Sequence, residues 1–251
     1  MTAGPPRRPR PVTRRAMTLE RVIGALIVAT GLAAVPTTRA RAMEMEIVGE
    51  QIQLAGPVVP GDFDQFQKLV KWRGFRISVV VLRDSPGGIA GEGFRIAELI
   101  RSERLRTAVA GRCFSACALI FLGGVQRGFA DEPPPGGNFV AFHGLYLMDG
   151  RLAKDVEAPT RDWIVKFTDR RIDPTLVKIW GRLENMQDAV LFFDPTRFKG
   201  KDGASVFICR TADAQRRRPA EQSCEPLADT DGYEQGIFTD RRVVRFIPPR
   251  R

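Results

Sequence analysis

Hydrophobic and polar positions after residue 42 change their period several times, which predicts alternating strands and helices. Residues 46–54 alternate as a half-exposed strand does. Residues 77–82 form a β-branched run, apolar apart from Ser78, that is typical of a strand covered on both faces. Two shorter apolar runs, residues 107–110 and 139–142, predict further buried strands.

Helical spacing of apolar side chains lies between these runs. Residues 61–72 begin with Gly61-Asp62 and predict a short helix, and residues 94–102 and 116–122 predict two more. Strands and helices that take turns in this way favour an α/β fold, with a parallel sheet of βαβ units and flanking helices.

The first 42 residues differ from the rest and resemble an export signal. An arginine-rich start is followed by an apolar run over residues 22–34 and by Ala40-Arg41-Ala42, which predicts cleavage before Met43. The mature protein is then expected in the periplasm or outside the cell, touching a membrane only through the leader before cleavage. An uncleaved membrane anchor is the alternative, since signal and anchor differ mainly in apolar length.

The leader also accounts for most of the basic charge. Of the 39 basic and 29 acidic residues, 8 and 1 lie in residues 1–42, so a net charge of +10 falls to +3. No nucleic-acid partner is therefore expected. The remaining 209 residues (251 − 42) suit one α/β domain, residues 43–200, with a small disulfide-containing extension, residues 201–251, packed on it.

The four cysteines fit an oxidising compartment. Cys209 and Cys224 flank a polar loop and are the expected disulfide of the C-terminal extension. Cys113 and Cys117 can pair only if the backbone between them is not regular helix, and small buried thiols are the favoured interpretation. The spacing suits no zinc site, and we expect neither a metal nor a cofactor.

One segment carries candidate catalytic chemistry at the ends of predicted strands. Ser85-Pro86-Gly87-Gly88 follows one strand, Ser115 follows the next, and His143, the only histidine, follows a third. A serine nucleophile needs a base and aimed N–H donors, and parallel strands place their carboxyl ends at one edge. Taken singly, each of these has a structural interpretation: Ser115 as an N-cap, Pro-Gly-Gly as a turn, and the histidine as a structural residue.

The joint order of these residues resembles the ClpP serine proteases of the ClpP/crotonase superfamily, and more closely the exported ClpP-like proteins of bacteria. The resemblance covers about residues 46–198. It implies a ClpP/crotonase-like fold, Ser115 as nucleophile and His143 as general base. It also implies an oxyanion hole formed by the backbone amides of Gly88 and Ala116.

The family's third residue, an aspartate, has no clean match. Asp188 lies nearest and Asp194 is the second choice. The resemblance implies a periplasmic serine peptidase acting on a peptide or protein substrate. Two alternatives stay open: a Ser–Lys peptidase similar to signal-peptide peptidases, with Lys166 as base, and a non-catalytic scaffold that binds peptide or self-associates into a homo-oligomer.

Overall fold

A computed structural model describes Met1 and residues 42–72, 76–131, 137–198, 200, 203–210 and 224–248. Residues from Thr38 onward form one compact unit, and the fold described below is that of this unit. The expected leader and its cleavage site lie almost wholly outside the described residues. Within the described segments, no helix has the length and apolar character needed to span a membrane.

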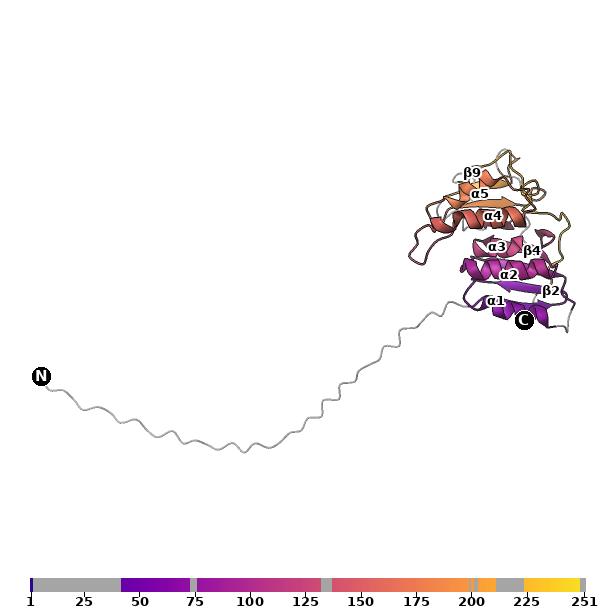
Figure 1. The fold of residues 1–251 in the computed structure, drawn as a ribbon, viewed down its shortest axis with the longest axis horizontal. Helices are drawn as coiled ribbons and strands as arrows, with labels where there is room; N and C mark the ends of the chain where they lie inside the picture. The colour runs from indigo at the N-terminus through magenta and orange to yellow at the C-terminus, as the bar shows by residue number, and fades with distance from the viewer. Residues whose placement is uncertain are drawn as a thin grey trace, which may run out of the picture. The chain divides into compact units, whose positions relative to one another are not determined.

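Strands and helices alternate between residues 51 and 129 of the unit (Figure 1). The strands are β1 (Glu44–Val48), β2 (Gln51–Ala55), β3 (Val79–Ser85), β4 (Arg106–Phe114), β5 (Arg127–Phe129), β6 (Phe139–Phe142), β7 (Ala189–Phe193), β8 (Val206–Cys209) and β9 (Cys224–Pro226). The helices are α1 (Asp62–Lys71), α2 (Ala90–Ser102), α3 (Ala116–Leu122), α4 (Glu157–Phe167) and α5 (Pro174–Gly181), with a short 3₁₀ turn at Lys154–Val156.

The described strands form one mixed sheet in the order β1-β2-β3-β4-β6-β7-β8-β9, with β5 paired to β4. Its centre, from β2 to β6, is parallel as the sequence predicts, but β1, β7, β8 and β9 pair antiparallel. The expectation of a wholly parallel sheet is therefore wrong at both edges. Residues 46–54 are two strands and not one, because Gly49, at φ 63°, reverses the chain in a tight turn.

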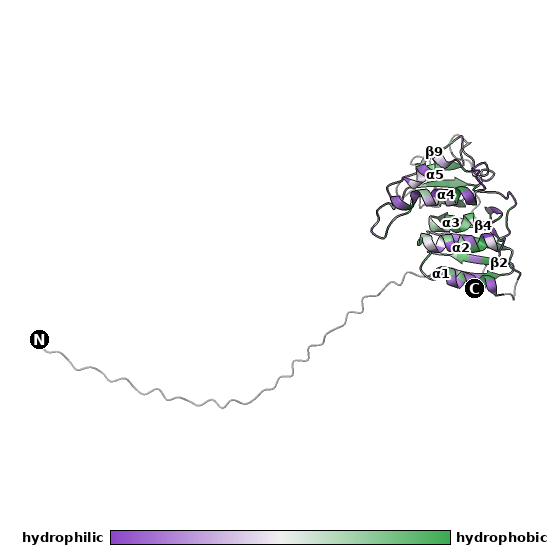
Figure 2. Ribbon diagram, viewed as in Figure 1, coloured by the Kyte–Doolittle hydropathy of each residue, from purple (hydrophilic) through white to green (hydrophobic). Residues whose placement is uncertain are grey.

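All five helices pack on the same face of the sheet. They share one apolar core with alternate strand residues such as Val80 and Leu82 of β3, and Figure 1 shows the helices side by side in front of the strands. Every residue of α3 is buried, and Figure 2 colours this helix hydrophobic while α1 and α2 carry both colours. The end of β4 and the whole of α3 are thus buried.

The C-terminal segment covers part of the opposite face. Val244 and Phe246 pack on Val79 and Val81 of β3, two β3 side chains that point away from the helices. The backbone also runs beside β5, where the Val244 amide donates to the Phe129 carbonyl over 2.9 Å. Burial of β3 on both faces, expected from its sequence, therefore depends on residues more than 160 positions later in the chain.

Candidate active site

Ser115 is the single residue between β4 and α3, and its backbone is strained. Its φ of 59° and ψ of −120° lie in a region that non-glycine residues rarely adopt. Its amide donates to the Ala141 carbonyl of β6 over 3.0 Å, which ties the turn to the neighbouring strand. The side chain makes no capping hydrogen bond to α3, so the structure contradicts the N-cap interpretation of this serine.

The residues two before and two after the serine are bonded to each other. Cys113 of β4 and Cys117 of α3 form a disulfide whose Cα atoms are 5.2 Å apart, and both side chains are fully buried. The favoured interpretation of these residues as free buried thiols is therefore wrong. The sharp turn at Ser115 brings the two cysteines within disulfide range. The sequence does not reveal this turn, so the pairing could not be predicted from it.

The Pro-Gly-Gly loop after β3 packs directly against the serine turn. Gly87 has φ 83°, and a Cβ added to it would lie 2.6 Å from the Ser115 Cβ and would overlap the Phe114 carbonyl. Gly88 has φ 143°, and its Cβ would overlap the Val58 carbonyl. Both positions therefore require glycine, because only a residue without a side chain allows this close approach.

Ala116 and Gly88, whose amides the resemblance assigns to an oxyanion hole, both lie near the serine turn: Ala116 follows Ser115 in the chain, and Gly88 follows Gly87, which packs on the turn. Ala116 is the first residue of α3, so its N–H has no acceptor within the helix. Gly88 lines the same cleft as Ser115. The loop that carries Gly88 is fixed by two hydrogen bonds with Val58. The Val58 amide donates to the Gly87 carbonyl over 2.8 Å, and the Ile89 amide donates to the Val58 carbonyl over 2.9 Å.

His143 follows β6 directly and reaches the same edge of the sheet. β6 runs parallel to β4 with Ala141 opposite Phe114, so Ser115 and His143 both leave the carboxyl ends of adjacent strands. The imidazole contacts two aromatic rings, with ring centroids 4.9 Å from Phe114 and 5.2 Å from Tyr146. This packing holds the ring beside the serine turn.

Burial gives the histidine an unusual titration. Both ring nitrogens are buried and have no hydrogen-bond partner among the residues that the structure describes. Loss of solvation lowers the pKa of His143 to about 4, from an ordinary value of 6.5. The imidazole is therefore neutral at physiological pH, the form that can accept a proton. It does not hydrogen-bond to Ser115 in this state.

Ser115, His143 and Gly88 line one open cleft of about 370 Å³. Its lining also includes the apolar side chains of Ile89, Leu145, Leu147, Met148 and Met186. Leu147 and Met148 are 48% and 95% exposed, so this part of the lining is open to solvent. The cleft that Ser115 lines is therefore accessible from solvent along these residues.

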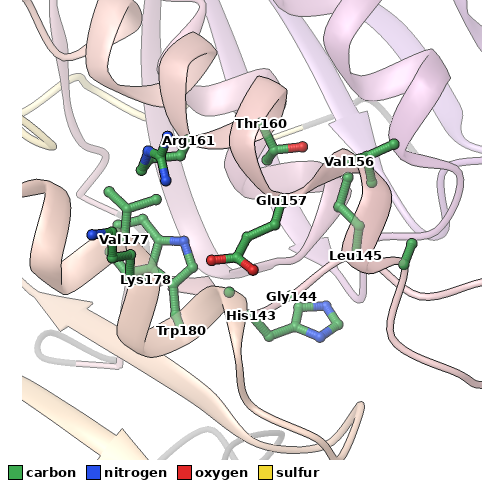
Figure 3. A pocket seen from close by; sticks show the side chains of 12 residues that line it. His143, Gly144, Leu145, Val156, Glu157, Thr160, Arg161, Val177, Lys178 and Trp180 are labelled. Atoms are coloured by element: carbon green, nitrogen blue, oxygen red, sulfur yellow. The ribbon is translucent and has the colours of Figure 1, made fainter.

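A second, small cavity lies behind the imidazole (Figure 3). Its volume is about 20 Å³, enough for one water molecule, and its walls include His143, Glu157 and Trp180. Figure 3 shows the Glu157 carboxylate pointing into this space from the first turn of α4. Arg182 pairs with the same carboxylate at 3.5 Å. Glu157 could not be singled out from the sequence, because nothing in the sequence distinguishes it from the other acidic residues of surface helices.

The candidate third residues occupy other places. Asp188 is 7% exposed just before β7 and lies 4.0 Å from Arg210, and its charge contributes to raising the pKa of Tyr146 to about 12, after burial. Asp194 caps a turn, accepting from the Thr196 amide over 2.9 Å. Neither of these two carboxylates hydrogen-bonds to the imidazole of His143.

Lys166, the base of the Ser–Lys alternative, is exposed near the C-terminal end of α4. It is separated from Glu157, which borders the imidazole cavity, by nine residues of helix, or roughly 13 Å along the axis. It does not line the cleft that contains Ser115.

Comparisons with known proteins give only distant structural similarity. No protein-family model matches the chain, and no curated protein matches it. Among solved structures, a serine-to-alanine mutant of the 1510-N membrane-bound stomatin-specific protease is 15% identical, with a TM-score of 0.40, and the match covers 51% of this chain and 66% of that one. An asparagine-to-aspartate mutant of ClpP1 from Listeria monocytogenes is also 15% identical, with a TM-score of 0.38, over 52% of this chain and 77% of that one. The chain thus spans about two thirds of the length of the first of these proteins.

Proposed function

We propose that the protein is a serine hydrolase that cleaves peptide bonds, with Ser115 as nucleophile and His143 as general base. The hydroxyl attacks the scissile carbonyl, and the neutral imidazole takes its proton. The amides of Gly88 and Ala116 donate to the oxyanion that forms. The proton then passes from the imidazolium to the leaving amine, and water completes the cycle.

The observation that carries this proposal is the backbone of Ser115. A strained φ/ψ pair at a non-glycine residue is retained only where the surroundings enforce it, and such residues gather at active sites. Here the strain presents a side chain without a capping role to an open cleft, beside the only histidine of the chain. A purely structural turn would be served better by glycine at this position.

The imidazole needs an acid to set its orientation, and we assign this positioning role to Glu157. Its carboxylate faces the cavity behind His143, where one water molecule can join the two groups. Asp188, which the resemblance favours, is the competing assignment. In Glu157→Gln we expect the rate constant for acylation of Ser115 to fall by at least about ten-fold, with substrate binding unchanged. Glu157→Asp should restore part of this rate. A loss confined to Asp188→Asn would assign the role to Asp188.

We also propose that the mature protein acts in the periplasm or outside the cell on peptide or protein substrates. Two disulfides support an oxidising compartment. The Arg-rich start, the apolar run and Ala40-Arg41-Ala42 support export with cleavage near Met43. N-terminal sequencing of protein from the periplasm tests this, and an intact leader in a membrane fraction would contradict it.

The activity is tested by mass spectrometry of an unstructured protein substrate incubated with the oxidised, mature protein. We expect cleavage products with the parent and with Lys166→Ala, and none with Ser115→Ala or His143→Gln. Loss in Lys166→Ala but not in His143→Gln would favour the Ser–Lys alternative. Peptide binding without cleavage in all four proteins would leave the non-catalytic scaffold.

A further inference from the structure

The disulfide that brackets Ser115 has a geometric consequence for the serine. If the chain continued as a strand beyond Cys113, the Cα of Cys117 would lie about 13 Å away. The observed separation is 5.2 Å. Because a disulfide requires Cα atoms within about 7 Å, the bond restricts the three residues between the cysteines to a sharp reversal. Ser115 is the centre of that reversal and the residue that carries its strain.

Other contacts of the turn are non-covalent. The Ser115 amide donates to Ala141, and the Gly87 loop lies against the serine on the opposite side. Side-chain capping, which fixes many strand-to-helix turns, is absent at Ser115. In the nucleophile elbows of other hydrolases, glycines stand two residues before and two after the serine. In this chain those two positions are the bonded cysteines.

Resting on the function proposed above, we propose that Cys113 and Cys117 are positioning residues whose disulfide holds Ser115 in its reactive backbone conformation. The nucleophile then gains its full reactivity only after oxidation. The two thiols give up two protons and two electrons to a disulfide oxidant, which leaves as two thiols. The serine of the reduced chain can relax toward an unstrained backbone, which moves its hydroxyl away from the Gly88 and Ala116 amides. Hydrolysis would thus be faster in the chain after export.

The second disulfide provides a matched control, since Cys209–Cys224 joins β8 to β9 at the sheet edge. The experiment measures fluorophosphonate labelling of Ser115 in the parent, in Cys113→Ala/Cys117→Ala and in Cys209→Ser/Cys224→Ser. All three are held at a temperature where circular dichroism shows them folded. The dependence of rate on probe concentration separates probe affinity from the rate constant of bond formation.

We expect the rate constant of bond formation to fall by at least about ten-fold in the Cys113/Cys117 variant, with probe affinity within about two-fold of the parent. The Cys209/Cys224 variant should keep the parent rate. Parent protein purified from a reducing host should label slowly and gain rate when glutathione disulfide is added. The labelling rate of the Cys113/Cys117 variant should not change when glutathione disulfide is added.

Equal rate constants in the parent and the Cys113/Cys117 variant would overturn this proposal and leave the hydrolase function intact. Absence of labelling in the fully oxidised parent would instead contradict the function itself. If the double alanine variant does not fold, the parent at graded glutathione redox ratios gives the same answer. The labelling rate must then rise in proportion to the fraction of protein in which the Cys113–Cys117 bond is formed, which thiol alkylation and mass mapping quantify. A labelling rate that rises only with the fraction of the Cys209–Cys224 bond would overturn the proposal.

Discussion

At the scale of single residues, the site depends on close backbone approaches that tolerate no added atoms. Gly87 lies against Ser115 with no room for a Cβ, whereas Gly91 in α2 has open space around its Cα. The two glycines are four residues apart in the same loop–helix unit. They therefore separate the effect of crowding the serine from the general effect of replacing glycine with alanine.

We expect Gly87→Ala to lower the free energy of unfolding by about 1–3 kcal/mol, because its φ of 83° is strained for alanine and its Cβ meets the serine turn. Labelling of Ser115 should fall by at least ten-fold, or about 1.4 kcal/mol in the barrier. Gly91→Ala should leave labelling unchanged and stabilise by up to about 1 kcal/mol, since alanine is the better helix former. Denaturant titration and labelling rates check both variants, and equal labelling in the two would contradict the crowding argument.

The buried imidazole predicts a specific pH dependence of stability. The pKa of His143 falls from 6.5 to about 4 on burial, so between these values the unfolded chain binds more protons than the folded one. Stability is thus complete above about pH 6.5 and falls toward pH 4, by on the order of 3 kcal/mol. His143→Gln should lose this part of the pH dependence. Denaturant titrations at several pH values measure it, and parallel curves for the two proteins would contradict it.

The reactivity of Ser115 should depend on the protonation state of His143. The neutral imidazole is the base, so the labelling rate should rise as pH increases through about 4 and stay level through neutrality. A midpoint near 6.5 would indicate a solvated imidazole, contrary to its packing against Phe114 and Tyr146.

At the scale of elements, a buried arginine links β5 to the C-terminal segment. The Arg127 guanidinium donates to the carbonyls of Gly124, Gly236 and Ile237 over 2.6, 2.7 and 3.0 Å, and its side chain is fully buried. Burial is the main cause that lowers its pKa to about 10, so it remains charged at neutral pH. Asp169 lies 3.7 Å away as a counter-charge.

Arg127→Met should destabilise the protein by about 3–5 kcal/mol, since three buried carbonyls lose their donor at once. Hydrogen exchange should rise first in residues 236–246, which the arginine holds against β5. Arg151→Met removes an exposed ion pair with Asp149 and should cost less than about 1 kcal/mol. A similar small cost for Arg127→Met would show that the C-terminal segment is held by its apolar contacts alone.

Sequence periodicity predicted the secondary structure where an element buries a regular face. It failed where a turn or a residue distant in sequence determines the structure. Residues 116–122 match α3 at both ends, because seven buried positions follow a clear strand-end serine. The hairpin at Gly49 and the antiparallel edge strands were not predicted, since pairing direction leaves no local pattern. The Cys113–Cys117 bond was missed because it depends on the backbone of Ser115, and Glu157 because its proximity to His143 arises only in the folded chain.

At the scale of the whole molecule, one sheet carries both the site and the C-terminal extension. β8 and β9 continue the sheet past β7, and the expected Cys209–Cys224 disulfide joins these two edge strands. The bond closes a loop of about 15 residues that lies largely outside the described segments. The bond therefore lies at the edge of the sheet, four strands along the strand order from β4.

Replacing this pair in Cys209→Ser/Cys224→Ser should lower the free energy of unfolding by about 3 kcal/mol, the chain-entropy value for a loop of this size. The stability loss should come without loss of labelling at Ser115. Peptide mapping under non-reducing conditions should recover the two cysteines in one linked fragment from the parent. Two free thiols at these positions would refute the pairing.

The central claim is that Ser115 is an activated nucleophile, and the site of fluorophosphonate attachment tests it most directly. Mature, oxidised protein is incubated with the probe at neutral pH, digested and sequenced by mass spectrometry, beside His143→Gln as the variant without a base. We expect a single phosphonylated residue, Ser115, with the rate lower by orders of magnitude in His143→Gln. No adduct, or an adduct at Ser115 that forms equally fast without the imidazole, would contradict the account.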